Sequence, residues 1–161
     1  MIQVGDGPGH VNTPEFTKAI ESEIAQEINR IRKDPKALIP ALKKRLQTYK
    51  DKYFKDSIGV QLESSEGAKA CEEAIAHLES AQPVYALTLA EGLSRCAKGH
   101  AADLSRSGEV SHTGRDGSSV GKRIKYYGYW KNKVGECIGT KCTKAIDFVV
   151  QWLIDDGVAS R

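Results

Sequence analysis

The feature that most constrains the fold is a stripe of apolar residues at helical spacing near the N-terminus. These residues recur about once per helical turn, at Phe16, Ile20, Ile24, Ile28 and Ile31. The spacing gives a helix one apolar face, which needs a core to cover it. Thr13 and Pro14 precede the stripe and suit the N-cap and the first helical position. The pattern therefore predicts an amphipathic helix over residues 14–33.

The rest of the chain is also predicted to be mostly helical. Asp34 and Pro35 repeat the cap-and-proline signal and open a second helix with a basic outer face. Further helices are expected over residues 66–80, 88–106 and 119–127, and Thr143 is expected to cap a last helix. The only convincing strand is Val134–Gly139. These elements predict a helix-rich α+β fold.

Composition limits the functions open to the chain. It has 161 residues and a formal charge of +3, which is too small for bulk attraction to a polyanion. It holds no apolar run of the roughly 18 residues that a membrane span needs. Residues 1–12 lack the pattern of a secretory signal, and their glycines and polar side chains predict a flexible arm.

The cysteines indicate the compartment. Four of them lie at irregular spacings, at Cys71, Cys96, Cys137 and Cys142. This number is too small for a scaffold built from disulfides, and no ligand set completes a metal site around Cys137 and Cys142. We therefore expect reduced thiols and an intracellular, cytoplasmic protein.

Three residues form the most interesting chemical set. His112, Glu136 and Asp155 are separated by 24 and 19 residues, and each lies in a loop or at the end of an element. Imidazole and carboxylate groups serve a divalent-metal site or a general acid–base pair. The same groups also form buried hydrogen-bonded networks that hold loops in place, and spacing alone favours this structural alternative.

Other candidates carry less signal. Residues 122–133 interleave five cations with tyrosines and a tryptophan, a pattern that suits phosphate contact and base stacking. The aromatics are more typical of core and cleft-rim positions, so no nucleic-acid partner is expected. His100 lies on the apolar face of its helix and is interpreted as a core histidine. Nucleotide-binding and serine-hydrolase motifs are absent from the sequence.

Five motifs in order resemble the CAP superfamily, the cysteine-rich secretory, antigen 5 and pathogenesis-related 1 proteins with their SCP domain. They are Leu87–Leu104, Ser111–Ser118, Tyr127–Gly128, Val134–Gly139 and Val150–Gly157. The resemblance implies an α-β-α sandwich with a cleft lined by two histidines and two acids, which binds a divalent metal in some members.

The resemblance also implies a domain organisation. Residues 13–33 correspond to the family's first helix, 34–81 to an N-terminal helical insertion, and 82–161 to the CAP core. This core is expected to be truncated, with an incomplete sheet, because the chain ends before the family's second histidine.

The family's cleft residues are only partly matched. His112 and Glu136 correspond to the first histidine and first acid, whereas Asp155 stands where the family usually has glutamate. Cys137 replaces an asparagine in the family's Gly-Glu-Asn motif. We expect no catalytic residues and no cofactor, with at most a weak divalent-metal site at His112 and Glu136.

The sequence therefore predicts a non-enzymatic CAP protein that acts as an interaction or structural module in a larger assembly, cytoskeletal or other. Its expected partners are proteins that cover the incomplete sheet. Two alternatives stay open: a divalent-metal-dependent hydrolase, and a lipid- or sterol-binding CAP protein.

Overall fold

The computed structural model describes residues 14–158, and it describes side chains from residue 17 onward. The flexible arm expected over residues 1–12 lies outside this range. The described chain forms two compact units, a larger one of residues 14–87 with 142–158 and a smaller one of residues 88–141. Each unit is described here by itself.

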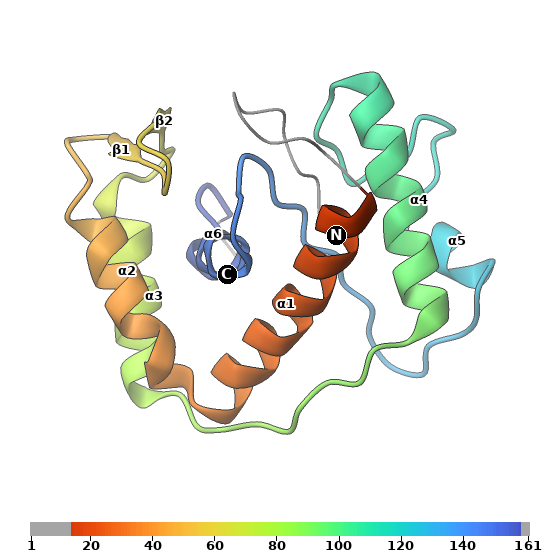
Figure 1. The fold of residues 1–161 in the computed structure, drawn as a ribbon, viewed down its shortest axis with the longest axis horizontal. Helices are drawn as coiled ribbons and strands as arrows, with labels where there is room; N and C mark the ends of the chain where they lie inside the picture. The colour runs from red at the N-terminus through yellow and green to blue at the C-terminus, as the bar shows by residue number, and fades with distance from the viewer. Residues whose placement is uncertain (1–13, 159–161) are drawn as a thin grey trace. The chain divides into compact units, whose positions relative to one another are not determined.

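The larger unit is an assembly of helices (Figure 1), and its buried side chains form one apolar core. Its helices are α1 (Pro14–Lys33), η1 (Pro35–Leu38), α2 (Ile39–Leu46), α3 (Ala68–Ser80) and α6 (Ala145–Ile154). The bounds of α1 confirm the helix predicted over residues 14–33. Helix α1 packs on α6, and α2 lies side by side with α3.

The core of the larger unit is built from side chains far apart in the sequence. Leu38 and Leu42 are fully buried and meet Cys71 of α3 and Ile154 of α6 in one cluster. The Cys71 thiol donates to the Leu42 carbonyl at 3.4 Å. Burial of such residues supplies most of the driving force for folding, at about 25 cal/mol per Å² of apolar surface.

The second predicted helix is divided by a proline. Pro40 lies in the first turn of α2, after the short 3₁₀ helix η1. Because proline has no backbone N–H, the carbonyl of Lys36 cannot receive the bond that a continuous α-helix would require. The last helix also differs slightly from expectation, since its N-cap residue is Lys144 and not Thr143.

A small hairpin stands where the sequence predicted only a break between helices. Strand β1 (Tyr53–Lys55) pairs antiparallel with β2 (Gln61–Glu63). At the turn, the Asp56 carboxylate accepts hydrogen bonds from the amides of Ile58 (3.0 Å) and Val60 (2.8 Å). Aspartate favours such turns because its side chain binds nearby amides, so the turn carried a readable signal.

The Asp156 carboxylate joins two segments of the larger unit that are far apart in the sequence. Asp156 accepts hydrogen bonds from the amides of Ser65 (2.7 Å) and Glu66 (2.9 Å) and from the Ser64 hydroxyl (3.0 Å). The Glu66 side chain accepts in return from the Gly157 amide at 2.8 Å. These bonds fix the chain just before α3 to the chain just after α6.

The smaller unit contains α4 (Glu91–Ser107), α5 (Val120–Lys125) and the loops around them. The prediction of a strand at Val134–Gly139 is wrong, since residues 133–138 have no regular secondary structure. Gly135 weakens strand formation there. In addition, the Glu136 side chain is held by α5 and the preceding loop, as described below.

The fold class is confirmed as helix-rich α+β with a minimal sheet. Helices account for 53% of the structure, beside the two-stranded sheet β1–β2. The assignment of residues 34–81 as an insertion stays a prediction. Among the helices in the described range, none is both long enough and apolar enough to cross a bilayer.

We predict that Asp156→Ala lowers the free energy of unfolding by about 2–3 kcal/mol, because three donors lose a charged acceptor. Urea denaturation followed by circular dichroism measures this loss. Asp34→Ala is the matched control, since the Asp34 side chain makes no cap hydrogen bond, and it should change stability by less than about 0.5 kcal/mol. Equal effects of the two substitutions would contradict the role of Asp156.

Candidate functional site

His112 and Glu136, two of the three predicted residues, meet in the smaller unit. Nδ1 of His112 lies 2.9 Å from Oε1 of Glu136. The imidazole is 64% exposed, whereas the carboxylate is only 5% exposed. A carboxylate that holds one ring nitrogen leaves the other free to accept a proton or bind a metal. The pair therefore has the elements of an acid–base site.

Arg123 is the main partner of the buried carboxylate. Its Nη2 group donates to both oxygens of Glu136, at 3.0 Å and 2.8 Å. The guanidinium is itself only 11% exposed. Arg123 was not singled out from the sequence, because it appeared as one of five cations in residues 122–133. No local pattern marked it, because adjacent residues of a helix point in different directions and the burial of Ile124 says nothing about Arg123.

The same arginine organises the loop that carries His112. Its guanidinium donates to the carbonyl of Ser118 at 2.6 Å and to that of His112 at 3.2 Å. A side chain on Gly114 would come within 2.6 Å of the Ser118 hydroxyl, so the loop closes tightly there. The loop between α4 and α5 is therefore held in one shape by α5.

His100 is buried beneath the pair, as predicted for a core histidine. It is 2% exposed, and its Nε2 lies 2.9 Å from the carbonyl of Ser111. A carbonyl only accepts, so Nε2 carries the proton. The same nitrogen is 3.9 Å from Glu136, and the buried Nδ1 has no hydrogen-bond partner among residues 14–158. His100 thus supports the loop from below.

The electrostatics of the site keep Glu136 ionised. Burial by itself would raise the pKa of this carboxyl group. The hydrogen bonds from Arg123 and His112, together with the charge of Arg123, outweigh burial and hold the pKa below its ordinary value. Glu136 is therefore ionised at neutral pH.

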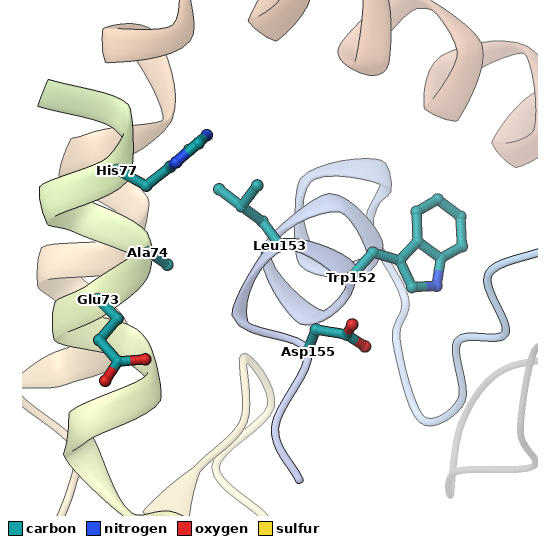
Figure 2. A pocket seen from close by; sticks show the side chains of 6 residues that line it. All are labelled: Glu73, Ala74, His77, Trp152, Leu153 and Asp155. Atoms are coloured by element: carbon teal, nitrogen blue, oxygen red, sulfur yellow. The ribbon is translucent and has the colours of Figure 1, made fainter. Parts of the chain in front are cut away.

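Asp155, the third predicted residue, belongs to the larger unit. It caps α6 in a left-handed conformation with φ 46°. There it lines a hollow of about 340 Å³ together with Trp152 and Leu153 of the same helix and His77 of α3 (Figure 2). The structure thus brings His112 and Glu136 together in one unit and places Asp155 in the other.

The donors within the smaller unit do not by themselves fit a zinc centre. A stable site needs three or more well-placed ligands, and this unit supplies His112 and Glu136. The carboxylate of Glu136 already carries a guanidinium. Within the described residues, no cluster of three or more histidine, cysteine or acidic side chains is arranged to hold a metal ion.

Comparison with known proteins identifies the family. The family model of CAP, the cysteine-rich secretory protein family, matches residues 25–160. The chain therefore belongs to the CAP family, which confirms the resemblance found in its motifs. No curated protein and no solved structure matches the chain significantly.

We predict that Arg123→Met destabilises the protein by about 3 kcal/mol, because it leaves a buried carboxylate without its cation. Chemical denaturation at pH 7 measures the change. Arg95→Met is the matched control. It breaks an ion pair with Glu91 in which both side chains are more than half exposed, so it should cost no more than about 1 kcal/mol. A mild effect at both positions would mean that the buried pair is not structural.

Acid should reduce the contribution of Glu136. Its pKa is lower in the folded state than in the unfolded state, so its stabilising effect is present above about pH 4.3 and disappears as the pH falls through the folded pKa. The difference in unfolding free energy between the wild type and Glu136→Gln is therefore expected to be largest at pH 7 and to shrink at pH 3.5. Urea melts at both pH values test this, with exposed Glu91→Gln as the control. A difference that stays constant with pH would contradict it.

Proposed function

We propose that this CAP-family protein is a non-enzymatic protein-interaction module that works inside the cell as part of a larger assembly and requires no metal. The observation that carries the proposal is the ion pair between Arg123 and Glu136. In this pair, the Arg123 guanidinium binds the carboxylate of Glu136, which the family resemblance assigns to the cleft.

The ion pair favours a structural role for the cleft residues. A metal at Glu136 would have to displace the Arg123 guanidinium from both carboxylate oxygens. The displaced charge would remain in a site where only 11% of its side chain is exposed. Burying an unpaired charge costs several kcal/mol, so the site is most stable as it stands.

An exposed apolar patch on the same unit supports an interaction role. Leu89, Leu93 and Tyr127, here called the α4 patch, are 70%, 50% and 48% exposed. Tyr127 lies against the first turn of α4, where a side chain on Gly92 would come within 3.1 Å of the Tyr127 Cβ. Exposed apolar side chains that gather in one region of a surface are typical of sites that bind other proteins.

The cysteines support an intracellular location. All four are thiols. Burial raises the pKa of Cys71 to about 11 and that of Cys142 to about 12, so both stay protonated at neutral pH. Buried, protonated thiols behave as small apolar side chains, which suits a protein kept in a reducing compartment.

A metal-dependent hydrolase is the second candidate. It is favoured by one observation, the exposed His112 imidazole oriented by a buried carboxylate. In this alternative, a metal bound at His112 would supply an activated water for hydrolysis.

We predict that the native protein elutes from size-exclusion chromatography of cell extracts at a mass several times that of its monomer. The double substitution Leu89→Ser with Leu93→Ser should shift it to the monomer position, because it makes the α4 patch polar. Ile58→Ser with Val60→Ser is the matched control, since these side chains are 48% and 44% exposed on the larger unit. This control should leave the assembly intact.

Two results would contradict the proposed function. The first is a wild-type protein that elutes as a monomer from its own cells. The second is stoichiometric zinc binding at micromolar affinity, measured by calorimetry, that is lost in His112→Ala and kept in the exposed-histidine control His77→Ala. The second result would favour the hydrolase.

A further inference from the structure

Positive charge is concentrated in the smaller unit and, within it, in one segment. Residues 88–141 contain ten lysines and arginines against five acids, a formal charge of +5 in a chain whose total is +3. Residues 120–133 contain five of these cations and no acid. The excess of charge is therefore local and belongs to α5 and the loop that follows it.

The loop that follows α5 folds back over the helix. The amides of Tyr127 and Gly128 both donate to the Ile124 carbonyl, at 2.8 Å and 3.1 Å, which turns the chain at the end of α5. Further along, the Trp130 ring lies against Gly121, where an added Cβ would be 3.3 Å from the indole. The loop therefore returns to the start of α5, so the two segments that carry the lysines lie in one region of the smaller unit.

We define the lysine–tyrosine surface as the exposed side chains of this region. They are Lys122, Lys125, Tyr126, Tyr129, Lys131 and Lys133. Tyr126 is 74% exposed and Tyr129 is 95% exposed. Aromatic rings this open to water gain from contact with an apolar partner, and their hydroxyl groups can donate to carboxylates.

We propose that the lysine–tyrosine surface docks an acidic segment of a partner protein. The inference rests on the proposed interaction function and deepens it by naming the chemistry of the partner. Ammonium groups pair with aspartate and glutamate side chains, while the tyrosine rings cover apolar residues between them. The surface lies in the same unit as the α4 patch, and Tyr127 of that patch directly follows Tyr126.

The kind of cation present favours carboxylates over nucleic acid. Arginine is the side chain best suited to bind phosphate, because its planar guanidinium group can donate two parallel hydrogen bonds. The single arginine of the segment, Arg123, is committed to Glu136 and to two loop carbonyls. The exposed cations of residues 120–133 are all lysines. A whole-chain charge of +3 provides little general attraction to a polyanion.

The secondary structure argues against a membrane surface as the occupant. Helices that lie in a membrane interface are long and amphipathic, with one broad apolar face. Helix α5 has six residues, three of which are basic, and its buried apolar residue is Ile124. The exposed aromatics follow the helix in an irregular loop and form no apolar helical face.

A direct binding experiment tests the proposal. The probe is a fluorescent peptide of four Glu-Glu-Leu repeats, compared by anisotropy with a Gln-Gln-Leu peptide, a 12-nucleotide single-stranded RNA and vesicles containing phosphatidylserine. We expect the wild-type protein to bind the acidic peptide at least tenfold more tightly than the neutral one. Binding should weaken as salt increases, because the contacts are ionic.

Two matched variants locate the contact. The triple substitution Lys125→Glu, Lys131→Glu and Lys133→Glu should weaken peptide binding at least tenfold. The control Lys36→Glu, Lys44→Glu and Lys50→Glu makes the same change of charge at exposed positions of the larger unit, and should change it less than twofold. Circular dichroism checks that both variants fold.

Several outcomes would overturn the inference. These are equal weakening by the two triple variants, no preference for the acidic peptide, or tighter binding of RNA or vesicles through the same lysines. A different measurement decides the proposed function. A large native assembly that depends on Leu89 and Leu93, in a protein with no affinity for the acidic peptide, would reject this inference and keep the interaction role.

Discussion

The ion pair between Arg123 and Glu136 is the interaction on which the smaller unit depends. It joins α5 to the irregular segment around Glu136, and the same guanidinium holds the loop through the carbonyls of His112 and Ser118. Because both charges are nearly buried, each needs the other, and removal of either leaves an uncompensated charge. One side chain of α5 thus supports two segments that lack regular secondary structure of their own, the loop between α4 and α5 and the chain around Glu136.

This arrangement separates the inner and outer surfaces of the unit by their chemistry. Inside, the cation and the acid neutralise one another, and the cleft residues of the CAP family become part of a framework. Outside, the lysines and tyrosines of the lysine–tyrosine surface are exposed to water. The proposed function rests on this division, because a carboxylate already paired with a guanidinium is a poor metal ligand, whereas exposed lysines and aromatic rings suit the recognition of a partner.

Sequence patterns predicted the helices well and the remaining structure poorly. The stripe that begins at Phe16 gave the bounds of α1, because an amphipathic helix depends on a local period. The prediction of a strand at Val134–Gly139 was wrong. A strand is stable only when it pairs with a neighbouring strand, and this segment is instead held by the ion pair between Glu136 and Arg123. The hairpin β1–β2 was missed although Asp56 marked its turn.

The sequence by itself determined the family, the order of the helices and the pairing of His112 with Glu136 as a candidate site. These follow from local periods and from motifs that read in order along the chain. Only the tertiary structure decided that Arg123 is the third member of that site and that Asp156 joins residues about 90 apart in the chain. Contacts between distant residues depend on how whole elements pack, and no local pattern encodes which charge will meet which.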